Sequence, residues 1–152
     1  MLNRCSIILI SFLLVAGCNP GPEDKPSIDD LVGIYKLVEA PSLCGFNINS
    51  NENSKITLKK DLSVSIEGIP DCINHLHGET KGELLNGVGT WEIVIPEVVS
   101  SYGLMFDISS NNSMKAGLYN TLVIVGKEKP FKLLYIIGDP DSMYRLTYEK
   151  LN

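Results

Sequence analysis

The sequence predicts an all-β fold, a small antiparallel meander of about eight strands that closes into a barrel or folds as a sandwich. Short runs rich in Val, Ile, Tyr, Phe and Thr recur from residue 31 to the end of the 152-residue chain. Gly, Asn, Asp and Pro separate these runs, which is typical of strands joined by turns. A fixed-period repeat and a long amphipathic helical pattern are both absent from the sequence.

The chain begins with a leader that is not part of this fold. Arg4 supplies a positive charge, an apolar stretch runs from Ser6 to Val15, and Ala16-Gly17 supplies the small side chains that signal peptidases accept. The stretch is ten residues long, whereas a helix that crosses a bilayer needs about twenty. Residues 1–17 are therefore predicted to be a cleaved signal peptide.

The residues Val15-Ala16-Gly17-Cys18 resemble a bacterial lipobox. This resemblance implies cleavage before Cys18 and acylation of its thiol, and several fatty chains anchor a protein to a membrane almost permanently. Asn19, rather than Asp, follows the cysteine and fits sorting to the outer membrane of a Gram-negative bacterium. The alternative is an ordinary signal peptide followed by an unmodified cysteine.

Cleavage leaves 135 residues, which is the size of one domain. We expect a lipidated cysteine and flexible tether over 18–29, rich in proline, and a single β domain over 30–152. The mature chain has 12 basic and 18 acidic residues, a net charge of −6. This charge disfavours nucleic acid and anionic head groups as partners, and we expect a monomer.

The first strands are predicted from local patterns. Asp29-Asp30 is expected to cap a turn before a strand over 31–38, and runs at 56–58 and 63–66 form a hairpin that turns near Asp61. Clean alternation over 89–95 predicts one inward and one outward face. The inward face holds Trp91, Ile93 and Ile95, and the outward face holds Thr90, Glu92 and Val94.

The later strands are predicted from the same kinds of apolar pattern. Leu104, Phe106 and Ile108 alternate, and residues 121–125 are apolar throughout, as in a strand covered on both sides. Two final strands, 131–137 and 143–150, flank a type I turn at 139–142. On the last strand Tyr144, Leu146 and Tyr148 are predicted to face inward, and Arg145, Thr147 and Glu149 to face water.

Three segments together resemble the small lipocalin-like lipoproteins of bacteria. They are Leu31-Val32-Gly33-Ile34-Tyr35-Lys36-Leu37, Ile56-Thr57-Leu58-Lys59-Lys60-Asp61 and Gly89-Thr90-Trp91-Glu92-Ile93. The family pattern is L-x-G-x-W/Y-x-L, then I-T-F-x-x-D-G, then G-x-W/Y. Leu62 stands where the family hairpin has glycine. The resemblance implies at most an interior cavity for an apolar ligand.

Two cysteines remain in the folded domain, since Cys5 leaves with the signal peptide and Cys18 is lipidated. In an oxidising compartment such a pair is expected to be bridged. We therefore predict a disulfide between Cys44 and Cys72. Closing this loop removes roughly 3 to 4 kcal/mol of unfolded-state entropy.

Aromatic residues on the predicted inward faces are candidates for a ligand pocket or for a filled core. They are Trp91, Phe106, Tyr135, Tyr144 and Tyr148. An eight-stranded barrel is at the size limit where the interior is either packed or holds one small ligand, and a packed interior is the favoured reading.

The sequence indicates neither an enzyme nor a cofactor. It lacks a nucleophile elbow, a Walker loop and a G-x-G-x-x-G motif. His75 and His77 would lie about 7 Å apart on one side of an extended segment, but a zinc site needs more ligands, so a solvated loop is the favoured interpretation. Asp139 and Asp141 are explained by turn chemistry rather than by calcium.

These observations lead to two functional hypotheses for a lipid-anchored envelope protein. In the first, the domain is a binding or accessory module for an apolar small molecule. In the second, it contacts another envelope protein, as an assembly factor, inhibitor or immunity-type protein does, and its interior is filled.

Overall fold

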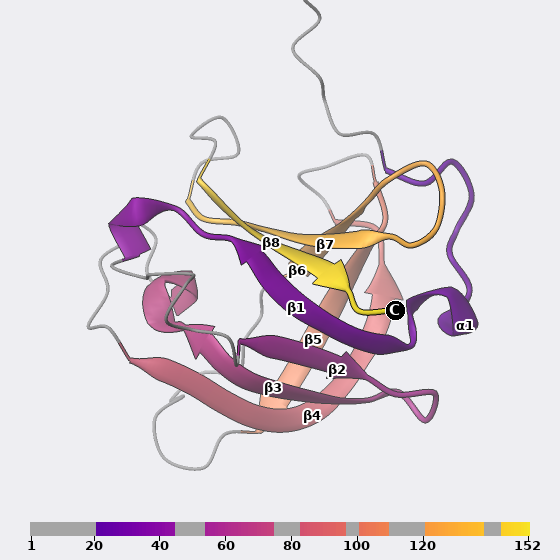
Figure 1. Ribbon diagram of the computed structural model, residues 1–152. Coiled ribbons are helices and arrows are strands. Elements are labelled where there is room, and N and C mark those ends of the chain that lie inside the picture. Colours follow the sequence, from indigo (N-terminus) through magenta and orange to yellow (C-terminus); the bar gives the residue numbers. More distant parts are fainter. Residues whose placement is uncertain (1–20, 45–53, 75–82, 97–100, 110–120, 139–143) are drawn as a thin grey trace, which may run out of the picture.

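The fold is an eight-stranded closed barrel in which each strand is antiparallel to the next (Figure 1). The computed structural model describes residues 21–44, 54–74, 83–96, 101–109, 121–138 and 144–152. The predicted all-β meander is confirmed, and it is a barrel rather than a sandwich. Its strands are β1 Gly33–Glu39, β2 Lys55–Leu58, β3 Ser63–Pro70, β4 Leu84–Val94, β5 Gly103–Ser109, β6 Thr121–Val125, β7 Lys132–Ile136 and β8 Arg145–Lys150.

Pairing of the first strand with the last closes the barrel. β1 meets β2 at Tyr35↔Ile56 and meets β8 at Leu37↔Tyr148. The β3–β4 register shifts between Ile66 and Ile69. Such irregularities bend a strand and increase its twist, which helps a short sheet to curve back onto itself.

The β2–β3 hairpin forms where the sequence predicts it. Lys59 N–H donates to the Ser63 carbonyl, and the Asp61 carboxylate accepts hydrogen bonds from both the backbone N–H and the hydroxyl of Ser63. Leu62 has a φ of 65°, in the left-handed region that favours glycine. Glycine would adopt this conformation without strain, whereas the Cβ of Leu62 makes it unfavourable.

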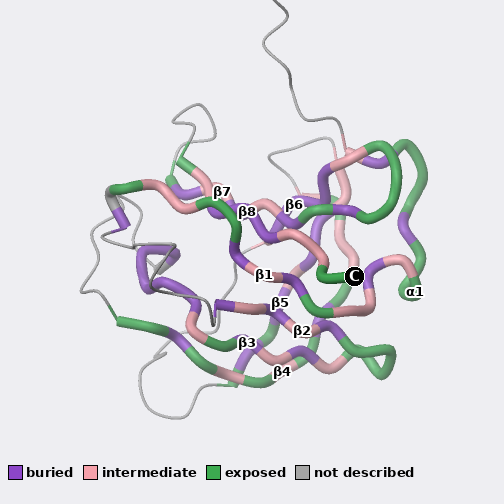
Figure 2. The backbone as a smooth tube through the Cα atoms, viewed as in Figure 1, coloured by how far each residue is buried: buried purple, intermediate pink, exposed green. Residues whose placement is uncertain are grey.

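Along most strands, buried residues alternate with less buried ones (Figure 2). Leu104, Phe106 and Ile108 of β5 are all buried, as their spacing predicts. Residues 122–125 of β6 are each at most 8 % exposed. Both faces of this strand are therefore covered, which confirms that prediction.

Ile95, Thr147 and Tyr144 depart from the predicted alternation. Ile95, predicted to face inward, is 71 % exposed, because β4 ends at Val94 and the chain leaves the barrel there. Thr147, predicted to face water, is buried. Its hydroxyl donates to Glu39 Oε2 at 2.8 Å, and Arg145 Nε lies 3.4 Å from the same oxygen, so these longer side chains cover it.

A single turn of helix, α1 (Ile28–Leu31), lies at one end of the barrel, which we name the α1 end. Ser27, rather than the predicted Asp29-Asp30 pair, is its N-cap. The Ser27 hydroxyl accepts from Asp30 N–H, and the Asp30 carboxylate accepts from Ser27 N–H. This reciprocal capping box satisfies two backbone donors that a helix terminus otherwise leaves unpaired.

Several contacts hold α1 against the barrel. Leu31 is fully buried, and its carbonyl accepts a hydrogen bond of 2.9 Å from the Tyr35 hydroxyl. Lys150 Nζ donates to the Asp30 carbonyl at 3.0 Å, and Lys129 forms an ion pair with the Asp30 carboxylate. The helix is thus joined to β1, β8 and the segment before β7.

The chain before α1 also lies against the α1 end. Pro22 and Pro26 are buried. A Cβ on Gly21 would overlap the Ser101 hydroxyl and lie 3.2 Å from the Ile124 carbonyl oxygen, so the Gly21 backbone is close to both. Residues 21–27 of the predicted tether lack regular structure, Ile28 and Asp29 begin α1, and Gly21, Pro22 and Pro26 contact the barrel.

A disulfide links two short 3-10 helices at the other end of the barrel, which we name the disulfide end. Cys44 ends η1 (Ser42–Cys44), and Cys72 lies in η3 (Asp71–Asn74). The Cys44–Cys72 bond is present, as predicted, and both residues are buried. It connects the chain after β1 to the chain after β3.

Some predictions concern residues outside the described ranges. These are the leader with Cys18, the histidines His75 and His77, and the turn at 139–142. Across the described ranges, the helices are too short and too polar to span a bilayer.

Candidate functional site

A small cavity lies inside the barrel toward the disulfide end. Its volume is about 20 Å³, on the scale of one water molecule. Its lining is apolar in character and comes from β2, β3, η3, β5, β6, β7 and β8. The lining residues are Ile56, Ile66, Ile69, Ile73, Phe106, Leu122, Tyr135, Leu146 and Tyr148.

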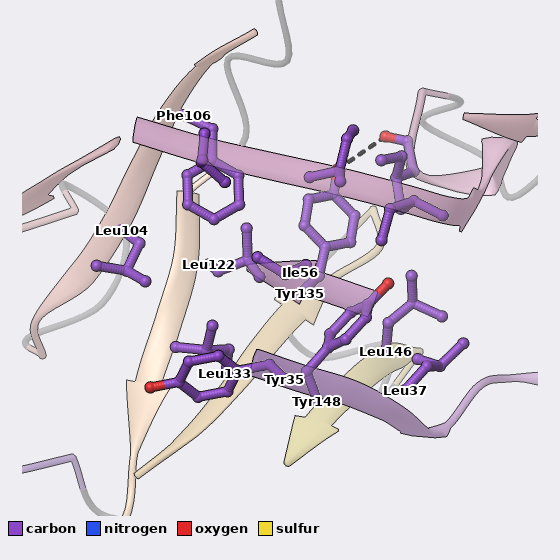
Figure 3. Packing of buried hydrophobic residues seen from close by; sticks show 14 of the residues in the cluster. Tyr35, Leu37, Ile56, Leu104, Phe106, Leu122, Leu133, Tyr135, Leu146 and Tyr148 are labelled. Carbon is purple, nitrogen blue, oxygen red and sulfur yellow. Dashed lines mark hydrogen bonds between the residues drawn. The ribbon is translucent and has the colours of Figure 1, made fainter. Parts of the chain in front are cut away.

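Large side chains fill the rest of the interior. Figure 3 shows the rings of Phe106, Tyr135 and Tyr148 directed into the space between the strands, with Leu122 and Leu146 beside them. Each of these five residues is at most 8 % exposed. The sequence predicts this arrangement through the alternation of apolar residues, although it could not determine how much space the rings leave.

Tyr135 joins the cavity wall to η3. Its hydroxyl donates a hydrogen bond of 2.8 Å to the Ile73 carbonyl oxygen, drawn as a dashed line in Figure 3. Burial raises the pKa of Tyr135 to about 12, so the hydroxyl keeps its proton at neutral pH. A proton on this oxygen is what the hydrogen bond to Ile73 requires.

Tyr148 differs from Tyr135 in the hydrogen bonding of its hydroxyl. Its hydroxyl and the Ser54 hydroxyl are both buried, and within the described residues neither has a hydrogen-bond partner of adequate geometry. Burial raises the pKa of Tyr148, and the Ser54 hydroxyl lowers it to a smaller extent. Burial of a hydroxyl without a hydrogen-bond partner lowers the stability of the fold, and a ligand or water that pairs with it would recover part of this loss.

The five predicted aromatic candidates do not form one site. Phe106, Tyr135 and Tyr148 line the cavity. Trp91 is buried elsewhere in the core, and its indole N–H donates to the Lys59 carbonyl at 3.1 Å, near the β2–β3 turn. Tyr144 is 49 % exposed, so its predicted place in the core is wrong: it precedes β8, where the alternation has not yet begun.

Metal-ligand chemistry has little support in the described part of the chain. There, groups of three or more His, Cys, Asp or Glu side chains able to hold an ion are absent. Cys72 is bonded to Cys44, and Asp71 is buried beside it. The weak candidates His75 and His77 lie outside the described residues.

A second hollow, of about 550 Å³, lies on the outside of β4 and β5 beside the β2–β3 turn. Thr90, Glu92 and Asp107 project from the outer faces of these strands, and Asp61 comes from the turn. Hydrogen bonds from Ser63 hold the pKa of Asp61 below its ordinary value, so this carboxylate stays charged. The sequence analysis missed this acidic hollow, because the strands that form it meet only in the folded sheet.

Comparisons of this chain with models of known protein families, with curated proteins and with solved structures find no match.

Proposed function

We propose that this chain is a lipid-anchored protein of the cell envelope and that its barrel is a module that contacts another protein. The small interior cavity is the observation that carries this proposal. Pockets for drug-sized ligands have volumes of about 300 to 1,000 Å³, whereas this cavity has about 20 Å³. A filled barrel offers a rigid outer surface for contacts rather than a container.

Two further features support a place in the envelope. The leader and the lipobox-like residues before Cys18 are those of an exported, acylated chain. The Cys44–Cys72 disulfide supports this reading, because structural disulfides persist in oxidising compartments and are rare in the cytosol.

Metabolic labelling tests the anchor. The full-length chain is expressed in a Gram-negative host fed an alkyne analogue of palmitate, beside a Cys18→Ser variant. We expect the unmodified chain to carry label and to fractionate with membranes, and the variant to carry none. A chain that stays unlabelled while it is produced at the same level would contradict the anchor.

Native mass spectrometry tests the module. The mature protein released from membranes should show the mass of the lipidated chain and of complexes with an envelope protein after crosslinking in cells. A small molecule that copurifies in stoichiometric amount would contradict a filled interior and would favour a carrier.

A carrier for a small apolar ligand is the second candidate, and the wholly apolar lining of the cavity favours it. Phe106, Leu122 and Leu146 contribute to this lining, so a ligand that enters would itself be small and apolar. Titration with a hydrophobic fluorophore tests the idea. Binding that Phe106→Ala abolishes and Tyr144→Phe leaves unchanged would support a carrier, and absence of binding would exclude it for such ligands.

A further inference from the structure

The path from the proposed anchor to the barrel is very short. Only Asn19 and Pro20 lie between Cys18 and Gly21, so the span is three residue steps, and an extended chain covers at most about 3.6 Å per step. Gly21 lies against Ser101 and the Ile124 carbonyl at the α1 end. A bilayer that holds Cys18 must therefore lie within about 11 Å of this part of the barrel.

The same end of the barrel carries exposed apolar side chains, which we name the apolar rim. Their exposed fractions range from 38 % to 71 %. They come from α1, the first residues of β1, the β2–β3 turn, the end of β4 and the carboxyl terminus. The apolar rim consists of Ile28, Ile34, Leu62, Ile95 and Leu151.

Backbone and ion-pair contacts hold parts of the apolar rim together. Leu151 N–H donates to the Ile34 carbonyl at 2.7 Å, so the carboxyl terminus lies beside the start of β1. Lys60 Nζ lies 2.8 Å from Asp29 Oδ1, which joins α1 to the turn that contains Leu62. The helix α1, the β2–β3 turn and the carboxyl terminus, which carry members of the rim, lie at one end of the barrel (Figure 1). Other exposed apolar side chains lie outside the rim, namely Val38, Leu84, Val88 and Tyr144.

Charge at the α1 end does not oppose contact with lipid as strongly as the net charge of the chain implies. Asp29 is paired with Lys60, and Asp30 with Lys129. Apolar side chains mixed with charged groups are suited to the boundary between head groups and acyl chains. The acidic hollow with Asp61, Glu92 and Asp107 lies on the outside of β4 and β5 and borders the apolar rim at Leu62.

We infer that the α1 end rests on the surface of the bilayer that holds Cys18, with the apolar rim among the lipid head groups. The disulfide end, with Cys44 and Cys72, then points away from the membrane, where a partner can reach it. This inference rests on the proposed lipid anchor. It adds an orientation of the barrel relative to the membrane. A lipid anchor alone does not fix this orientation, because a barrel on a long tether could turn freely.

Single introduced cysteines test the orientation. In the mature chain Cys18 is acylated by the proposal and Cys44 is bonded to Cys72, so one new thiol is selectively labelled with a fluorophore. Ile95→Cys reports on the α1 end. Leu84→Cys is the matched control, because it is also exposed and lies at the opposite end of β4. Eleven residues of strand separate the two positions, a path of about 36 Å.

The labelled, lipidated proteins are placed in phosphatidylcholine vesicles that contain a lipid with a spin label on its head group, which quenches nearby fluorophores. We expect severalfold stronger quenching at residue 95 than at residue 84. Equal quenching at both positions, or stronger quenching at 84, would overturn the orientation. Circular dichroism of each variant shows whether it retains the barrel, and Val88→Cys on the middle of β4 serves as an intermediate position.

Flotation with the vesicles tests the lipid anchor independently of the quenching measurement. If the wild-type chain floats and the Cys18→Ser chain does not, the quenching comparison judges the orientation by itself. If the wild-type chain also fails to float, the lipid anchor is wrong and the inference falls with it.

Discussion

The Tyr135 hydroxyl donates a hydrogen bond of 2.8 Å to the Ile73 carbonyl oxygen, and so joins β7 to a 3-10 helix 62 residues earlier in the chain. Tyr148 lines the same cavity, yet its hydroxyl has no partner in the described part of the chain. The two tyrosines therefore offer a matched pair in which the same substitution should have different effects on stability.

Tyr135→Phe should lower the free energy of unfolding by about 1 kcal/mol, because it removes the buried hydrogen bond between the Tyr135 hydroxyl and the Ile73 carbonyl. Urea denaturation at neutral pH measures this change. A variant as stable as the wild type would mean that this hydrogen bond is replaced, for instance by water.

Tyr148→Phe should leave stability unchanged or raise it by up to about 1 kcal/mol, since it removes a buried hydroxyl that lacks a partner. The same urea titration measures it beside Tyr135→Phe. A loss as large as that of Tyr135→Phe would show that the Tyr148 hydroxyl is satisfied in solution.

Removal of the disulfide through Cys44→Ser combined with Cys72→Ser should destabilise the barrel. The bond closes a loop of 28 residues, and the chain-entropy relation gives a loss of about 3 to 4 kcal/mol. Denaturant midpoints of the oxidised chain, the reduced chain and the double variant measure it. The reduced chain and the double variant should agree, and a midpoint equal to that of the oxidised chain would contradict the prediction.

Acid should weaken the attachment of α1. The Lys129 ammonium and the hydrogen bonds from Ser27 lower the pKa of Asp30 from 3.8 to about 2. Because the folded pKa is below the unfolded one, this stabilisation is complete above about pH 4 and is lost as pH falls toward 2. Asp30→Asn should reduce the loss of thermal stability between pH 5 and pH 2.5, and Asp107→Asn on the outer face of β5 is the control. An Asp30→Asn chain with the wild-type pH profile would argue against this role.

Leu62→Gly should raise the melting temperature slightly. A residue with a side chain costs about 1 to 2 kcal/mol in the left-handed region, and glycine would relieve this strain. Part of the relief is offset, because glycine has more conformational freedom to lose when the chain folds. Leu84→Gly is the matched control, because Leu84 is similarly exposed but lies in a strand, where glycine is unfavourable. A drop in melting temperature for both variants would indicate that packing of the Leu62 side chain outweighs its backbone strain.

The sequence by itself determined the strands and the disulfide. Alternation with a period of two is a local property, so the inward positions Leu104, Phe106 and Ile108 could be identified without the fold. The cysteine pair followed from elimination, since the sequence assigns Cys5 to a predicted leader and Cys18 to predicted lipidation, which leaves Cys44 and Cys72.

The tertiary structure alone decided where the pattern stops and which polar groups find partners. Ile95 is exposed because β4 ends at Val94, and Tyr144 is exposed because β8 begins at Arg145. The Tyr135 hydroxyl donates to a carbonyl 62 residues away, whereas the Tyr148 hydroxyl has no hydrogen-bond partner among the described residues. The volume left inside and the close contact of Gly21 with the α1 end likewise depend on segments distant in sequence, and these meet only when the eight strands close.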